Sequence, residues 1–154
     1  MQALTTFSKF VAIITEPIVI LILALVISIF LYTNKQKSQA ILLASTFIIT
    51  AATIKLLKNI FQVERPISTL IQETGYSFPS GHTTFAVVFF GLITYIFAKP
   101  KHKISATIIS IALISIIAFT RLYLQTHWLT DIIAGLITGG IILALSILIH
   151  KKFT

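Results

Sequence analysis

The chain has 154 residues, of which 56% are hydrophobic and only 10% are charged, and its formal net charge is +8. Ordinary soluble domains contain about 25% charged residues, so this composition excludes a water-exposed globular exterior. The positive charge does not indicate a nucleic-acid-binding protein, because the cations are dispersed among apolar segments and form no continuous basic patch.

Five apolar segments are long enough for membrane-spanning helices, which need about 20 consecutive apolar residues. In chain order they cover approximately residues 10–33, 39–57, 82–98, 104–121 and 127–149. No stretch between them is long enough for a separate soluble domain. We therefore predict an all-α, polytopic membrane helix bundle with about five transmembrane helices, which forms a single domain over residues 1–154.

The first apolar segment contains an interruption at Glu16-Pro17. Thr15 can cap a helix that has Pro17 in its first turn. Residues 4–14 are then a short interfacial helix that leads into the first span. We expect this segment to be retained rather than cleaved as a signal peptide, because no small-residue cleavage pattern follows it.

Lysines in the connections indicate how the chain crosses the membrane. Seven of them fall on one predicted side: Lys35, Lys37, Lys99, Lys101, Lys103, Lys151 and Lys152. The positive-inside rule makes that side cytoplasmic. The N-terminus, the connection 58–81 and the turn 122–126 then face outward. We therefore expect a functional site on the extracytoplasmic face of the inner or plasma membrane.

Two cations follow the second apolar segment. Lys58 lies at its end, and Arg65-Pro66 comes after six intervening residues, where proline stops any helix. Such cations often extend to the membrane surface without binding a ligand. The alternative is an anion-binding pair, because ionisable groups at membrane depth are costly and tend to be paired or functional.

Pro79-Ser80-Gly81-His82 opens the third apolar segment. These residues are ordinary helix-start signals, and a histidine that only caps the helix is one interpretation. The other is an anion site, because the first turn of a helix offers free backbone N–H groups and the positive end of the helix dipole. Gly81 would let an anion approach the backbone closely. His82 would then be a proton donor beside the anion.

The third cluster comprises Thr120-Arg121, His127 and Asp131. His127 and Asp131 are four residues apart at the start of the fifth segment, so they share a helix face and can form a hydrogen bond. Asp131 would fix the imidazole tautomer and leave the other ring nitrogen free as a nucleophile or base. The alternative is a pair that only satisfies a buried aspartate.

All three clusters fall on the same predicted side of the membrane. They resemble the three-part signature of the type 2 phosphatidic acid phosphatase (PAP2) superfamily, as Lys58-x6-Arg65-Pro66, Pro79-Ser80-Gly81-His82 and Arg121-x5-His127-x3-Asp131. The resemblance covers about residues 40–145. Two departures are visible: Thr120 stands where the family usually has serine, and the chain has five predicted spans where membrane members usually have six.

The resemblance implies a PAP2-like core and a membrane lipid phosphatase that forms a phosphohistidine intermediate. His127 would attack phosphorus, Asp131 would support it, and His82 would protonate the leaving oxygen. Five groups would hold the phosphoryl oxygens: the side chains of Lys58, Arg65, Arg121 and Ser80, and the backbone N–H of Gly81.

We expect no cofactor and no metal. The chain has no cysteine to supply thiolate ligands. Two-metal phosphatases need several converging carboxylates, whereas the predicted outer side has only Glu16, Glu64, Glu73 and Asp131. The expected partners are the lipid bilayer and a membrane lipid phosphate substrate, with no nucleic acid and no obligate protein partner.

A site at the bilayer surface predicts an amphiphilic substrate whose tails stay in lipid. In a bacterium, the resemblance points first to undecaprenyl pyrophosphate, because a diphosphate suits three cations and an outward-facing site. Phosphatidylglycerophosphate, phosphatidic acid and lipid A 1-phosphate are the alternatives. A lipid phosphotransferase and a non-catalytic lipid-binding or lipid-translocating protein are the other two interpretations, although mere binding would need neither an acid nor a nucleophile.

Other polar and small residues fall outside this signature. Gly135-x3-Gly139 indicates close packing between helices. His102 and His150 lie in the cytoplasmic-side basic segments, where we expect solvated surface positions. Lys55 lies one turn before Lys58 but belongs to no motif, so we expect its removal to be mild.

Overall fold

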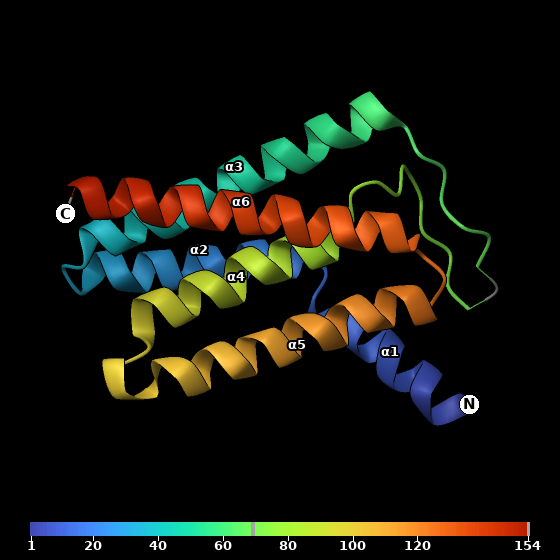
Figure 1. Ribbon diagram of the computed structural model, residues 1–154, viewed down its shortest axis with the longest axis horizontal. Coiled ribbons are helices and arrows are strands. Elements are labelled where there is room, and N and C mark those ends of the chain that lie inside the picture. The colour runs from blue at the N-terminus through green and yellow to red at the C-terminus, as the bar shows by residue number, and fades with distance from the viewer. Residues whose placement is uncertain (69, 154) are drawn as a thin grey trace.

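The computed structural model describes residues 1–68 and 70–153, and within them it contains helices and no strand. The described residues form six α-helices, and Figure 1 shows that they are arranged as a bundle. Their bounds, with a short 3₁₀-helix η1, are α1 Gln2–Ile14, α2 Pro17–Thr33, α3 Lys37–Phe61, α4 Gly81–Phe97, η1 Pro100–His102, α5 Lys103–Tyr123 and α6 Leu129–Phe153. The predicted all-α bundle is confirmed.

Three of the helical segments are long and apolar enough to cross a membrane: α3, η1 with α5, and α6. Helix α4 has 17 residues, which at 1.5 Å per residue gives about 25 Å, against about 30 Å for the hydrocarbon core. Helices α1 and α2 meet at 46° and count as a fourth candidate span when taken together. The protein is therefore a multi-pass membrane protein, and the predicted segment 10–33 is bent rather than continuous.

The bend lies at the sequence interruption between α1 and α2. Pro17 is the first residue of α2, a position where its missing N–H costs nothing. The Thr15 hydroxyl donates to the Val11 carbonyl oxygen at 2.6 Å, and Glu16 is the N-cap of α2. The prediction that Thr15 caps the second helix is wrong, because its hydroxyl is satisfied within the end of α1.

Two glycines bring α4 and α6 together. A Cβ atom added at Gly139 would lie 2.9 Å from Cβ of Val87, and one at Gly135 would lie 3.0 Å from the carbonyl oxygen of Ser80. Only glycine permits this approach, so the predicted packing role of these residues is confirmed. As a result, the backbone N–H of Ser80 donates to the Asp131 carbonyl oxygen at 3.0 Å. The second and third motifs therefore meet.

The bundle has an apolar core and an apolar exterior. Leu43 of α3 and Val88 of α4 are fully buried in a cluster that α2 and α6 also share. Large hydrophobic side chains such as Ile22, Ile108 and Leu148 are exposed on the outside. An exterior of this kind is stable in contact with lipid tails rather than water.

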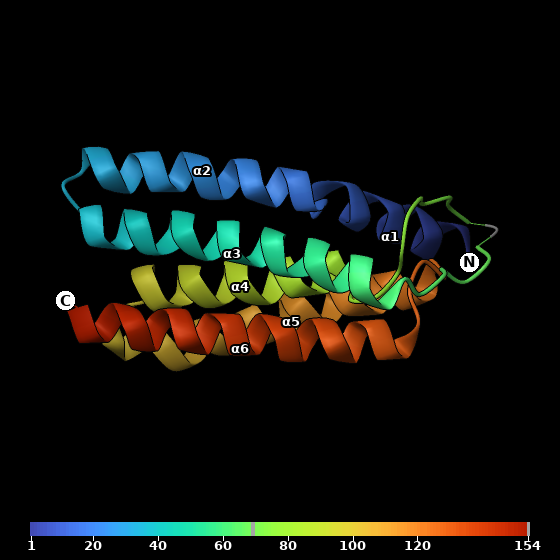
Figure 2. The same ribbon diagram turned by 90° about the horizontal axis from the view of Figure 1, so that it is seen from above.

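The two ends of the bundle carry different groups. The α2–α3 and α4–α5 connections and the C-terminal end of α6 lie at one end, and the segments 62–68, 70–80 and 124–128 lie at the other, near the N-terminus (Figures 1 and 2). The seven lysines from which we predict the cytoplasmic side therefore gather at the first end. The three motifs gather at the opposite end, as the topology predicts.

Candidate active site

A histidine–aspartate pair lies where α6 begins. Nδ1 of His127 is 3.2 Å from Oδ2 of Asp131, and both side chains are almost completely buried. The same Oδ2 accepts the backbone N–H of Trp128 at 2.9 Å. Because a carboxylate only accepts, Nδ1 is the protonated nitrogen and Nε2 keeps its lone pair. The hydrogen bond predicted from the four-residue spacing is confirmed.

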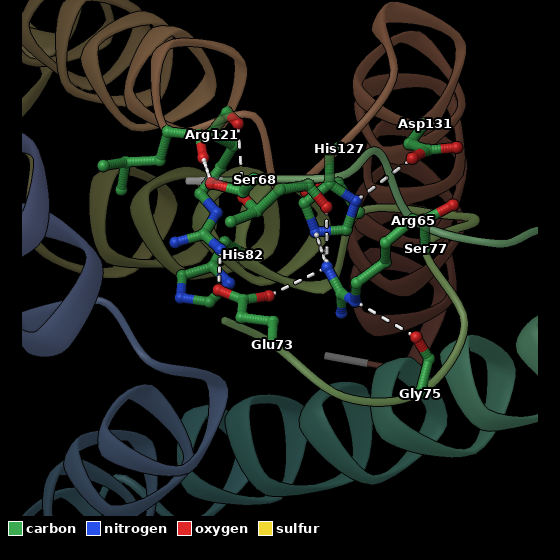
Figure 3. Close-up of polar contacts among 12 residues, drawn as sticks. Arg65, Ser68, Glu73, Gly75, Ser77, His82, Arg121, His127 and Asp131 are labelled. Atoms are coloured by element: carbon green, nitrogen blue, oxygen red, sulfur yellow. Dashed lines mark hydrogen bonds and ion pairs between the residues drawn. The ribbon is translucent and has the colours of Figure 1, made fainter. Parts of the chain in front are cut away.

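Arg65 covers the other nitrogen of His127. Its Nη1 lies 3.2 Å from Nε2 of His127 and donates to the Thr126 carbonyl oxygen at 2.8 Å. Its Nε donates to the Gly75 carbonyl oxygen at 3.1 Å. Figure 3 shows the guanidinium group between His127 and Gly75. The first and third motifs, far apart in the sequence, thus meet at one imidazole ring.

Glu73 joins Arg65 to Arg121. Its Oε2 is 2.8 Å from Nη1 of Arg65, and its Oε1 accepts from Nη2 of Arg121; Figure 3 shows both contacts. Arg121 is fully buried, and its Nε and Nη1 have no hydrogen-bond partner among the described residues. Unpaired buried donors are costly, so this pocket of positive charge has unused capacity to bind an anion.

Burial and charge set the protonation of the site. Burial lowers the pKa of His127 to about 4; the hydrogen bond with Asp131 opposes this, and the arginines add to it. His127 is therefore neutral at pH 7. Burial raises the pKa of Glu73, but attraction to Arg121 and Arg65 outweighs burial and holds the pKa below its ordinary value. Glu73 is therefore an anion.

Ser80 and His82 open α4, but both contact groups other than the arginines. The Ser80 hydroxyl oxygen accepts from the hydroxyl of Thr83 at 3.1 Å, and it caps the helix. His82 is buried, with Nε2 3.1 Å from Oε2 of Glu16 and 3.2 Å from the Ala12 carbonyl oxygen. The residue that caps α4 is thus Ser80, not His82. Phosphate binding by Ser80 and Gly81, and proton donation by His82, stay predictions.

Lys58 and Arg65 contact neighbouring residues of the connection between α3 and α4: Lys58 contacts Tyr76, and Arg65 contacts Gly75. Its ammonium group, in the last turn of α3, donates to the Tyr76 carbonyl oxygen. A largely apolar cavity of about 370 Å³ lies beside it, lined among others by Leu21, Ile54 and Phe85. The structure thus brings Lys58 near the arginines through the connection rather than by direct contact.

Two carboxylates were not predicted as site residues. Glu73 pairs with two motif arginines, and Glu16 pairs with the motif histidine of α4. Both belong to segments between helices, where no periodicity relates them to their partners. The only indication in the sequence was their negative charge, since they are among four acidic residues in a chain of net charge +8.

The sequence profile of the PAP2 superfamily matches residues 17–154. The chain belongs to this superfamily. The match begins at the first residue of α2 and includes all three motifs, so the resemblance inferred from those motifs is confirmed.

Two curated relatives of this PAP2 protein are named as lipid phosphatases. Phosphatidylglycerophosphatase B of Bacillus subtilis is 33% identical over 91 residues, which cover 55% of this chain and 45% of the relative. Undecaprenyl-diphosphatase of Sulfolobus acidocaldarius is 30% identical over 133 residues, which cover 82% of this chain and 62% of the relative. The chain therefore spans less than two thirds of the length of either relative.

The fold of this PAP2 protein also matches a solved structure. The crystal structure of a transmembrane PAP2-type phosphatidylglycerolphosphate phosphatase from Bacillus subtilis aligns with a TM-score of 0.92 and 24% sequence identity. The alignment covers 100% of this chain and 80% of that one. The predicted PAP2-like helix bundle is therefore confirmed.

Proposed function

We propose that this protein is an integral membrane lipid phosphatase that hydrolyses a lipid phosphate or diphosphate through a phosphohistidine intermediate. The supporting observation is the position of the Glu73 carboxylate, which Arg65 and Arg121 hold beside the imidazole of His127. Phosphoryl oxygens use the same guanidinium donors as carboxylate oxygens. A phosphoryl group bound there would lie next to a neutral ring nitrogen, as nucleophilic attack requires.

In the first step, Nε2 of His127 attacks phosphorus, and the bond from phosphorus to the leaving oxygen breaks. Asp131 accepts the Nδ1 hydrogen bond and stabilises the positive ring of the phosphohistidine. His82 gives a proton to the leaving oxygen, which departs as an alcohol or a lipid monophosphate. The contact with Glu16 orients the His82 ring.

In the second step, water attacks the phosphohistidine and releases orthophosphate, and His82 takes a proton from that water. Throughout, Lys58, Arg65 and Arg121 neutralise the negative charge on the phosphoryl oxygens. The Ser80 hydroxyl and the Gly81 N–H at the start of α4 add hydrogen bonds to the same oxygens.

The proposed reaction is metal-independent. Three cationic side chains take the place that metal ions have in two-metal phosphatases. Across residues 1–68 and 70–153, no three His, Cys, Asp or Glu side chains gather closely enough to hold a metal ion. The donor set therefore favours charge neutralisation by arginine and lysine.

The substrate that fits this site is an amphiphile. A cavity of about 320 Å³ is lined by the charged groups of Arg65 and Glu73, and the largely apolar cavity of about 370 Å³ beside Lys58 is lined by Leu21 and Phe85. The charged lining of the first suits a phosphate head, and the apolar lining of the second suits a lipid chain. Undecaprenyl pyrophosphate is the first candidate, since a diphosphate suits three cations; phosphatidylglycerophosphate follows, and the two relatives' names support both.

We also propose that the protein lies in the plasma membrane with its site on the extracytoplasmic face and acts without an obligate protein partner. The seven lysines at the other end of the bundle support this orientation. The N-terminus and the site lie at the same end (Figure 2).

A substrate panel tests the proposal. The purified protein is incubated in EDTA with undecaprenyl pyrophosphate, phosphatidylglycerophosphate, phosphatidic acid and lipid A 1-phosphate, and released orthophosphate is measured. We expect release with wild type and loss with His127→Ala. Undiminished release by His127→Ala would exclude the proposed nucleophile. Transfer of the phosphoryl group to an added acceptor would instead identify a phosphotransferase, and lipid binding without release a non-catalytic protein.

A further inference from the structure

Four consecutive residues, Glu73–Tyr76, contact all three motif cations and are called the latch here. The Glu73 carboxylate binds Arg65 and Arg121. The Gly75 carbonyl oxygen accepts from Nε of Arg65, and the Tyr76 carbonyl oxygen accepts from Lys58. The cations that would hold a phosphoryl group therefore already bind an anion and two carbonyl dipoles of the protein itself.

The latch and a phosphoryl group would use the same donors. Nη1 of Arg65 has two hydrogens but faces three acceptors: Glu73, the Thr126 carbonyl oxygen and Nε2 of His127. A fourth acceptor cannot be added to that nitrogen. Glu73 therefore competes with a phosphoryl oxygen for Nη1 of Arg65, the nitrogen that lies beside Nε2 of His127.

The connection that contains the latch is anchored on both sides, while the latch itself is accessible. Before it, the Ser68 hydroxyl donates to the Leu124 carbonyl oxygen at 2.6 Å. After it, the Ser77 N–H donates to the Val63 carbonyl oxygen at 2.8 Å. Between these anchors, Thr74, Gly75 and Tyr76 are exposed. The latch can therefore move outward without any helix of the bundle moving.

Gly75 makes the closed position possible. Its φ is +75°, a left-handed conformation that glycine adopts freely and alanine does not. No atom lies within 4 Å of the position where a Cβ would be added. Alanine at this position would therefore strain the closed latch without a steric clash and without any change of charge.

We propose that the latch is an internal competitor of the phosphate group, and that Glu73 determines how tightly an anion must bind to enter the site. The proposal rests on the proposed function only for the identity of the substrate. A closed latch lowers the apparent affinity of every anion by the same factor, the fraction of molecules in which the site is open. Weakly bound headgroups are then kept out, and product phosphate is expelled when Glu73 returns to the arginines.

The test measures orthophosphate binding by calorimetry in the full chain in detergent, without lipid substrate or turnover. In Glu73→Gln the arginines lose their internal anion, so we expect the Kd for orthophosphate to fall about tenfold. In Gly75→Ala the closed latch is strained but all charges remain, and we expect a fall of about fivefold. Glu64→Gln is the matched control, because its exposed side chain loses the same charge outside the latch.

We expect Glu64→Gln to stay within about twofold of wild type. Unchanged or weaker phosphate binding in both latch variants would overturn the proposal. If Glu73→Gln does not fold, the result with Gly75→Ala alone decides. Tighter binding in the latch variants together with no turnover of any lipid by wild type would refute the proposed function and leave the latch intact. Turnover by wild type with unchanged binding in the variants would refute the latch alone.

Discussion

A histidine with hydrogen-bond partners lies at each end of helix α6. At the start, His127 contacts Asp131 and Arg65. In the last turn, Nε2 of His150 lies 3.0 Å from the Ser38 hydroxyl and Nδ1 lies 3.2 Å from the Tyr95 hydroxyl. The prediction that His150 is solvated surface is wrong, because it ties α6 to α3 and α4 and packs edge-on against the Tyr95 ring.

The two histidines differ in the chemistry of the partners described above. The hydroxyl groups beside His150 can each donate or accept, so they select no tautomer. The Asp131 carboxylate can only accept, and it leaves Nε2 of His127 unprotonated. Arg65 and Arg121 add positive charge on that side of His127, where an anion can bind. The first end therefore carries the candidate active site, whereas the histidine at the second end joins α6 to α3 and α4.

The largest expected effect is that of His127→Ala. Loss of the nucleophile should reduce turnover of a lipid phosphate at least about 10³-fold. The expected change in fold is small, because Asp131 keeps its bond to the Trp128 N–H. Turnover is measured as orthophosphate release, and the thermal midpoint is measured on the same sample. Turnover within tenfold of wild type would place the nucleophile elsewhere.

The next prediction concerns pH. Burial lowers the pKa of His127 to about 4, so the folded protein keeps this ring neutral down to about pH 5. An unfolded chain protonates the ring near pH 6.5, so His127 destabilises the fold progressively as pH falls from about 6.5 to 4. NMR titration of labelled histidine rings, assigned with His127→Gln, measures the pKa. Protonation of His127 near pH 6.5 in the folded protein would contradict the expected lowering of its pKa by burial.

Two lysines on α3 give a smaller, paired prediction. Lys58 reaches the latch and Lys55, which is exposed, lies one turn away beside the same apolar cavity. We expect Lys58→Ala to lower kcat/KM about 30-fold, the effect of losing one charge-assisted hydrogen bond to phosphate. Lys55→Ala should stay within about threefold, since an exposed charge contributes little. Equal losses in the two variants would extend the phosphate site along α3.

The smallest expected effect is that of His150→Ala, at the other end of α6. Two hydrogen bonds to hydroxyls and one ring contact are lost, so we expect stability to fall by about 1 kcal/mol. Turnover should stay within about twofold, because the site lies at the opposite end of the bundle. Thermal unfolding and phosphate release report the two quantities. A loss of turnover above tenfold would show that the ends are coupled through α6.

Local properties of the sequence predicted much of this protein. Apolar segments of about 20 residues indicate membrane helices wherever they occur, because each helix satisfies its own backbone hydrogen bonds. Likewise, the four-residue spacing of His127 and Asp131 places them on one helix face whatever the rest of the chain does. The dispersed lysines indicated the two ends of the bundle. None of these inferences needs a contact between distant segments.

The tertiary structure alone decided what each of these groups faces. Glu73 is 48 residues from Arg121 in the sequence, and it reaches both arginines only because Ser68 and Ser77 anchor the connection between α3 and α4. Glu16 meets His82 only because α1 and α2 bend at Pro17. Such pairings depend on how segments without periodicity pack, which no spacing rule describes. The sequence by itself determined the helices and the His127–Asp131 hydrogen bond, and packing determined which anion the arginines hold.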